Sequence, residues 1–134
     1  MSFSNKFGPG YAGVIDGSQL DKALAYMYGI GTMSYANGIT ALAGGGRTGA
    51  PTVSEFLTSV DTVTSGNDSI QLPAALPGSV FVIQNNTATS MQVFANGSDT
   101  INGTAGATGV AQAGNKGAVY WCPKKGVWFR ILSA

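Results

Sequence analysis

The chain has 134 residues, of which 44% are hydrophobic and only 10% are charged, whereas a typical soluble domain is about 25% charged. The net charge of +1 disfavours a nucleic-acid-binding protein, which would present a basic face. A membrane-spanning helix is not expected, because no apolar run reaches about 18 residues. So little charge leaves isolated molecules poorly protected from association, and we therefore expect much of the surface to meet partner chains.

Residues 1–17 are predicted to form an extended arm. The segment contains Gly8-Pro-Gly10, which prevents a helix from continuing through Tyr11. The aromatic residues Phe3, Phe7 and Tyr11 recur every four positions. An arm with aromatic side chains and no core of its own either docks on a neighbouring subunit or folds back on its own domain. The sequence leaves both interpretations open.

A single short helix is predicted over Ser18–Tyr28. Ser18 is a suitable N-cap, and Asp21 follows three residues later in the position of a capping-box acid. The apolar side chains fall on one helical face, and Gly29 can end the helix. This face is formed by Leu20, Leu24, Met27 and Tyr28. We interpret it as a core or interface stripe.

Residues 29–51 are rich in Gly, Ala and Ser and are predicted to be a linker or a close-packed turn. The glycine run Gly44–Gly46 lacks the Gly-Lys-Ser/Thr sequence that a phosphate-binding loop needs. In the next segment, the spacing of Val53, Phe56, Leu57 and Val60 fits a short helical piece. This piece would lead into an alternating strand over Val60–Thr64.

The second half of the chain reads as a series of strands separated by turn residues. Asn96-Gly97 and Asn102-Gly103 are strong turn signals. In Val80–Ile83 both faces are apolar, which predicts a central strand that is buried on both sides. The expected strands are Asp68–Leu72, Gly78–Gln84, Ser90–Ala95, Gly117–Cys122 and Gly126–Leu132. In the last of them Val127, Phe129 and Ile131 face one way, and Trp128, Arg130 and Leu132 the other.

This pattern predicts a mainly β protein. We expect a β-sandwich or jelly-roll-like domain over residues 51–134. Residues 1–50 would supply the arm, the short helix and the glycine-rich linker that precede it.

The residue types needed for common enzyme chemistry are missing. The chain has no histidine, which removes the usual general base and most zinc sites. Asp61, Asp68 and Asp99 could converge as catalytic carboxylates, but their surroundings favour turn capping. A calcium site that combines Asp99 with Asn102 does not match an EF-hand loop. We expect no enzyme activity, no cofactor and no metal.

Aromatic residues and one cysteine lie in the last two predicted strands. The single Cys122 excludes an intrachain disulfide and is expected to be a small buried hydrophobe. Tyr120, Trp121, Trp128 and Phe129 would form a sugar-stacking platform if they were exposed. Because they alternate with apolar strand residues, the sequence favours core or subunit-interface positions for them.

A series of motifs resembles small structural proteins of tailed bacteriophages. The series begins with Ile39–Ala50 and Val60–Ala75 and continues with Val82–Asn85, Met91–Phe94 and Asp99–Gly103. It closes with Val119–Cys122 and Val127–Phe129. This series, over about residues 39–132, resembles head decoration (cement) proteins, and related β-modules occur in head fibres and tail appendages.

The resemblance implies a virion protein on the outer surface of the capsid, where a homotrimer sits over capsomer junctions. Its partners would be the major capsid protein and further copies of itself, with no nucleic acid and no membrane. The candidate contact residues are Phe3, Phe7, Tyr11, Tyr26 and Tyr28. The alternative is a tail-fibre or head-fibre module that binds a host surface glycan.

Overall fold

The computed structural model describes residues 34–134, which form one compact unit. The predicted arm and helix, and with them the contact residues Phe3, Phe7, Tyr11, Tyr26 and Tyr28, lie outside the described residues. Within 34–134 the secondary structure consists of strands, and no helix occurs in this part of the chain. The prediction of a mainly β protein is therefore confirmed. The described residues accordingly offer no helix that is long and apolar enough to cross a membrane.

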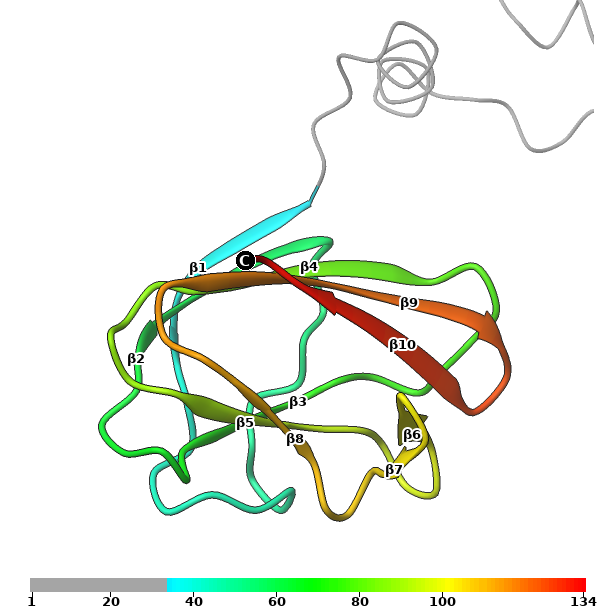
Figure 1. Ribbon diagram of the computed structural model, residues 1–134, viewed down its shortest axis with the longest axis horizontal. Coiled ribbons are helices and arrows are strands. Elements are labelled where there is room, and N and C mark those ends of the chain that lie inside the picture. Colours follow the sequence, from blue (N-terminus) through cyan, green and yellow to red (C-terminus); the bar gives the residue numbers. More distant parts are fainter. Residues whose placement is uncertain (1–33) are drawn as a thin grey trace, which may run out of the picture. The chain divides into compact units, whose positions relative to one another are not determined.

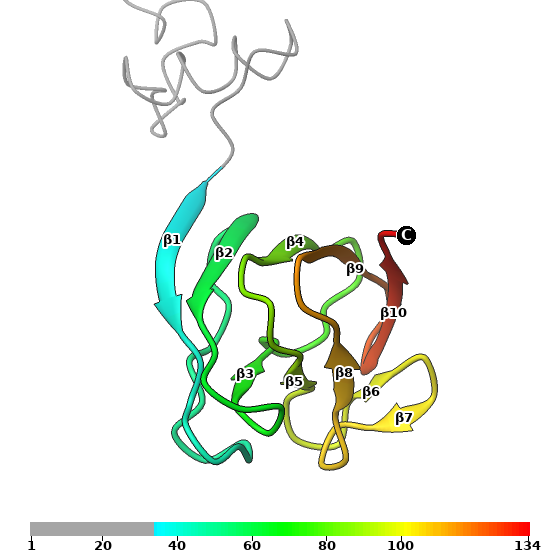
Figure 2. The same ribbon diagram turned by 60° about the vertical axis from the view of Figure 1, so that its left-hand side comes forward.

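Ten strands within residues 34–134 make two sheets (Figure 1). The larger sheet has seven strands in the order β1-β2-β4-β9-β10-β6-β7, and the smaller has three in the order β3-β5-β8. The larger sheet comprises β1 (Tyr35–Thr40), β2 (Leu57–Thr62), β4 (Val80–Asn85), β9 (Lys116–Lys124), β10 (Val127–Leu132), β6 (Thr100–Ile101) and β7 (Thr104–Ala105). The smaller sheet comprises β3 (Ser69–Gln71), β5 (Met91–Phe94) and β8 (Val110–Gln112). Figure 2 shows β3, β5 and β8 lying across the inner side of β2, β4 and β9.

The first half of the unit winds from sheet to sheet. The chain passes from β2 to β3, then to β4 and β5, and so alternates between the two sheets. When the chain returns to a sheet, the new strand pairs in parallel with the strand that it formed there before. These pairs are β1 with β2, β2 with β4, and β3 with β5. A sandwich or jelly roll is built mainly from antiparallel pairs. The parallel winding suggests a β-solenoid-like arrangement instead, which the β9–β10 hairpin closes.

Two local predictions were wrong. The glycine-rich stretch contains a strand, β1, which pairs with β2 from Tyr35 to Thr40 despite register shifts on either side of Ile39. The helical piece expected between Val53 and Val60 does not form: residues 53–56 are irregular, and Leu57 begins β2. Tertiary pairing overrides local preference in both segments, because each strand completes its hydrogen bonds on a neighbour that is distant in sequence.

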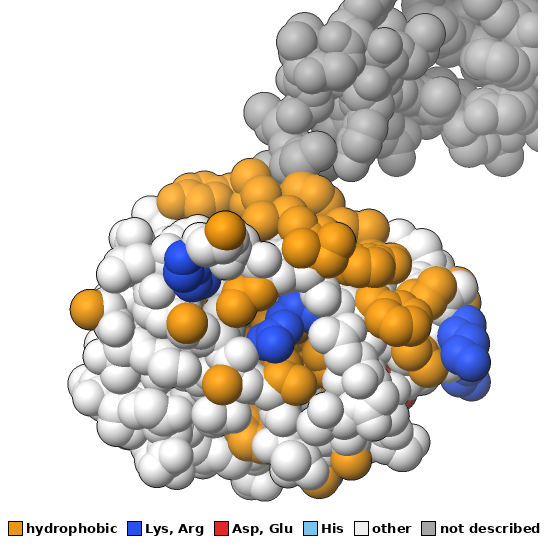
Figure 3. All heavy atoms as spheres, viewed as in Figure 1, with side chains coloured by type: hydrophobic (Ala, Val, Ile, Leu, Met, Phe, Trp, Pro, Cys, Tyr) orange, Lys and Arg blue, Asp and Glu red, His pale blue; other side chains and the backbone are white. Residues whose placement is uncertain are grey.

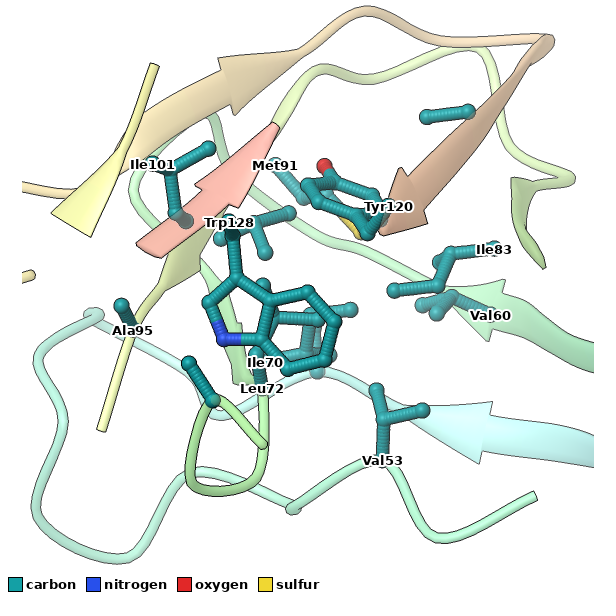
Figure 4. Packing of buried hydrophobic residues seen from close by; sticks show 14 of the residues in the cluster. Val53, Val60, Ile70, Leu72, Ile83, Met91, Ala95, Ile101, Tyr120 and Trp128 are labelled. Atoms are coloured by element: carbon teal, nitrogen blue, oxygen red, sulfur yellow. The ribbon is translucent and has the colours of Figure 1, made fainter. Parts of the chain in front are cut away.

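The hydrophobic core lies between the two sheets and includes Trp128, Tyr120, Ile83, Ile70 and Met91, all of them buried (Figure 4). Phe81 covers one side of the core, and its ring lies 5.8 Å from that of Trp128. The strand β4 occupies a central position as predicted, but its outer residue Val80 is exposed. The expected burial on both faces of this strand is therefore wrong.

A buried polar network joins the two sheets at one end of the core. The Tyr120 hydroxyl donates to Gln112 Oε1 at 2.9 Å, and Gln112 Nε2 donates to the Ile83 and Lys116 carbonyls. The nearby Asn85 Nδ2 donates to the Thr89 carbonyl at 2.8 Å. Burial raises the pKa of Tyr120 to about 12, so this hydroxyl remains a hydrogen-bond donor at neutral pH.

The predicted turns are confirmed. Asn102 and Gly103 connect β6 to β7 and have φ values of 49° and 81°, the left-handed conformation that Asn-Gly turns favour. Asn102 also accepts the Arg130 N–H at 2.9 Å through its side chain. This turn therefore attaches the short β6–β7 hairpin to β10.

Candidate interaction surface

The outward side of the larger sheet carries a continuous apolar row across five strands. Tyr35 of β1 lies opposite Leu57 of β2, and Leu57 lies opposite Val82 of β4. Val82 lies opposite Val119 of β9, which in turn lies opposite Ile131 of β10. Directly opposed side chains on one sheet face are close enough to contact each other. The row is therefore one surface built from segments that are far apart in sequence.

A second apolar row runs beside the first over three of these strands. Val80 lies opposite Trp121, and Trp121 lies opposite Phe129. The Trp121 and Phe129 rings are stacked, with centroids 5.9 Å apart and an angle of 27° between their planes. The two rows together are called the apolar face: Tyr35, Leu57, Val80, Val82, Val119, Trp121, Phe129 and Ile131.

Strand alternation explains why this side of the sheet faces outward. Residues next to the apolar face along the same strands, such as Ile83, Ala118, Tyr120 and Trp128, point into the core and are buried. The large hydrophobic residues exposed in the described chain are Tyr35, Leu76, Val80, Val119, Phe129 and Ile131. All of them except Leu76 belong to the apolar face. Figure 3 shows hydrophobic side chains gathered along the upper edge of the molecule, where Figure 1 places β1, β4, β9 and β10.

The apolar face is not uniform in relief. A hollow lies between β1, β2 and β4 and is lined by Tyr35, Leu57, Thr58, Ser59, Val82 and Gln84. The stacked pair Trp121 and Phe129 lies on β9 and β10, at the other side of Val82 and Val119. The same face thus carries this stacked pair, which we call the aromatic ridge, and a separate hollow.

A polar row borders the apolar face. Ser59 lies opposite Gln84, and Gln84 lies opposite Gly117, whose carbonyl accepts the Ser133 N–H at 2.7 Å. Beyond it, Asp61 accepts hydrogen bonds from the Ser59 hydroxyl at 2.7 Å and from the Gly38 N–H at 2.6 Å. These two bonds, with one from Asn86, lower the pKa of Asp61. The border is therefore polar and already hydrogen-bonded within the chain.

The acidic residues considered as catalytic candidates do not converge. Asp68 binds the turn at residues 64 and 65, and Asp99 accepts the Ala75 N–H at 2.8 Å. No group of three or more His, Cys, Asp or Glu side chains that could hold a metal occurs within residues 34–134. The predicted turn capping is confirmed for Asp68, whereas the side chain of Asp99 binds a segment that is distant in sequence in place of its own turn. Cys122 is buried and free, as predicted.

The aromatic residues of the last two strands divide between the two sides of the sheet. Tyr120 and Trp128 are fully buried, whereas Phe129 is exposed and Trp121 half-buried. The sequence pattern of β10 gave the correct alternation but could not identify the outward side. The residues contributed by β1, β2 and β4 were missed, because their place on one face depends on which strands pair.

Comparison with protein-family models, curated proteins and solved structures finds no match for this chain. The candidate surface is therefore interpreted from its own geometry and chemistry.

Proposed function

We propose that this protein is a structural component that works by adhesion, without enzyme activity, and that the apolar face is its main contact surface. The observation that carries the proposal is the unbroken row from Tyr35 to Ile131. Exposed contiguous apolar patches of this kind mark interaction sites. The aligned strands give the side chains fixed positions, as a repeated contact requires.

The specific role we propose is that of a decoration protein on the outer surface of a bacteriophage capsid. The resemblance of residues 39–132 to such proteins supports this role, and so does the combination of low charge with an adhesive sheet face. The partners would be the major capsid protein and two further copies of this chain in a homotrimer. The solenoid-like winding would supply a stiff support for contacts that repeat around the capsid.

Immunogold electron microscopy on purified virions, with antibody to this chain, tests the proposed location. Gold spread evenly over the heads is the expected result. Gold confined to the tail tip, or intact particles without label, would contradict a decoration role. Particles from a phage that lacks the gene provide the control for antibody specificity.

The second candidate function is recognition of a host surface glycan by a head or tail appendage. The observation that favours it is the outward Trp121–Phe129 stack, since aromatic faces can pack against sugar rings. Glycan-array binding that is lost in Trp121→Ala and kept in Leu76→Ala would support this candidate. The decoration role predicts no glycan signal for either variant or for the wild type.

A further inference from the structure

We propose that the apolar face is covered by a second copy of this chain, with the aromatic ridge of one copy lying in the hollow of the other. The inference deepens the proposed function and rests on it, because it names the occupant of the same surface. The argument uses the relief of the face, its charge and its size.

The relief of the face is self-complementary. The Trp121–Phe129 ridge lies on β9 and β10, whereas the hollow lined by Tyr35, Leu57 and Val82 lies over β1, β2 and β4. When two copies meet face to face about a two-fold axis that lies between the two sheets, parallel to the strands and over the middle strand β4, each ridge enters the hollow of the other copy. In a homotrimer the ridge of each copy would instead enter the hollow of the next copy around a closed three-fold axis, so each face would contact two neighbours.

Charge favours a copy of the chain over a different partner. None of the eight residues of the apolar face is charged, so the face offers nothing to guide a charged partner toward it. A second copy brings an equally neutral face. The whole chain carries a net charge of only +1, so two copies repel each other little.

The size of the face suits one side of a modest interface. Five strands spaced about 4.8 Å apart span about 24 Å, and six residues of strand extend about 20 Å. The outward side of these strands, with the apolar face and the polar border together, therefore covers about 480 Å² in projection, of which the apolar face makes about half. The accessible area is larger because side chains make the surface uneven. A standard interface buries about 800 Å² on each partner. A second sheet packed at about 10 Å, as sheets commonly pack, would cover the whole face.

The polar border fixes the position of one copy relative to the other along the strands. Two copies that are displaced along the strands would place the Ser59–Gln84–Gly117 row against the apolar rows of the partner. Polar groups that are buried against apolar side chains without hydrogen bonds cost free energy. The border therefore disfavours displaced arrangements and selects the one that matches the two apolar rows.

Molar mass measured by light scattering over a dilution series of the purified full chain tests this proposal. The test compares Ile131→Lys with Leu76→Lys, because the two residues are 63% and 57% exposed and only Ile131 belongs to the apolar face. We expect the wild type and Leu76→Lys to form a dimer or trimer, and Ile131→Lys to be a monomer at the same concentrations. A wild type that is monomeric throughout the series, or equal masses for the two variants, would overturn the proposal.

Cysteine cross-linking tests the ridge-to-hollow contact itself. Chains with Tyr35→Cys are mixed with chains with Phe129→Cys and treated with a short bis-maleimide, and the buried native Cys122 is kept. A linker is needed because two sheets that pack about 10 Å apart are too distant for a direct disulfide. The expected product is a cross-linked mixed pair, which should not form when Leu76→Cys replaces Phe129→Cys. Equal yields from both mixtures would overturn the arrangement.

These measurements are independent of the virion. Self-association that Ile131→Lys abolishes, together with absence of gold from the heads, would leave the inference standing and refute the decoration role. If Ile131→Lys chains still associate with one another in solution, and gold labels the heads of virions, the decoration role would be supported and the inference overturned.

Discussion

At the scale of single residues, Asp68 organises the loop before β3. Its carboxylate accepts the Thr64 hydroxyl at 2.6 Å, the Thr64 N–H at 2.7 Å and the Ser65 hydroxyl at 2.8 Å. It also accepts the Gly44 N–H at 3.1 Å, from the segment that follows β1. The bonds from Thr64, followed by that from Ser65, hold the pKa of Asp68 well below its usual range. One side chain thus connects two loops that are distant in sequence.

Replacing Asp68 with Asn should weaken the acid sensitivity of folding. The folded pKa lies below the unfolded value of about 3.9, so the carboxylate stabilises the fold fully above about pH 4. This stabilisation is lost as the pH falls from about 4 toward the folded pKa. We expect the urea midpoint of the wild type to fall more between pH 7 and pH 3 than that of Asp68→Asn, which should be less stable at pH 7.

The matched control for this prediction is Glu55→Gln, which removes one carboxylate outside the loop. It tests whether the loss of any one carboxylate is enough to change the dependence of the urea midpoint on pH. If Asp68→Asn loses as much stability between pH 7 and pH 3 as the wild type does, the assigned role of Asp68 is wrong.

At the scale of elements, the sequence predicts strands better than it predicts their partners. The runs of strand-forming residues between turn signals located β3, β4, β5, β9 and β10, and alternation was clearest in β10. The strand β1 was missed, since Gly38 has a φ of 70° and interrupts the pattern. The strands β6, β7 and β8 are only two or three residues long, which is too short for a period to appear.

The apolar face could be predicted only in part for the same reason. The alternation of β10 placed Phe129 and Ile131 together on one side. Their alignment with Tyr35, Leu57 and Val82 depends on parallel pairing between strands that the chain visits in separate passes. Alternation within a strand carries no information about such pairing, and a β-sandwich or jelly-roll-like domain was predicted instead.

Two loops that cross at the end of the β4–β9 pair give an element-scale prediction. The Asn115 N–H donates to the Thr87 carbonyl at 2.7 Å, and a Cβ on Gly114 would lie 2.3 Å from the Ala88 carbonyl oxygen. Gly114→Ala should therefore separate the loops and destabilise the fold by about 1–3 kcal/mol, the usual cost of overpacking. Urea denaturation at one fixed protein concentration measures the change.

Gly66→Ala is the matched control, because a Cβ at Gly66 meets no atom within 4 Å. A surface substitution of this kind should change stability by no more than about 0.5 kcal/mol. Equal losses of stability in the two variants would mean that the close approach of the loops does not limit the fold.

At the scale of the whole molecule, the two sides of the larger sheet have different roles. The inner side carries Trp128, Tyr120 and Ile83 and holds the two sheets together. The outer side carries the apolar face and leaves the core untouched. Substitutions on the inner side should therefore lower stability, and those on the outer side should change association.

The two tryptophans of the chain lie on opposite sides of this sheet and can report on the two roles separately. A Trp128→Phe variant keeps only Trp121, at the edge of the apolar face. The indole N–H of Trp128 has no hydrogen-bond partner in the described part of the chain, so this change removes ring volume without breaking such a bond. A Trp121→Phe variant keeps only the buried Trp128 as the internal reference.

Acrylamide quenching of these two variants over a range of protein concentrations distinguishes covering of the face from a change in the fold. Quenching of Trp121 should decrease as concentration rises, because a second copy then shields the ridge from the quencher. Quenching of Trp128 should be weak at every concentration, since its ring is fully buried in a single chain. Quenching of Trp121 that is independent of concentration would show that the ridge stays open. A parallel decrease for both residues would indicate compaction of the whole unit in place of contact through one side of the sheet.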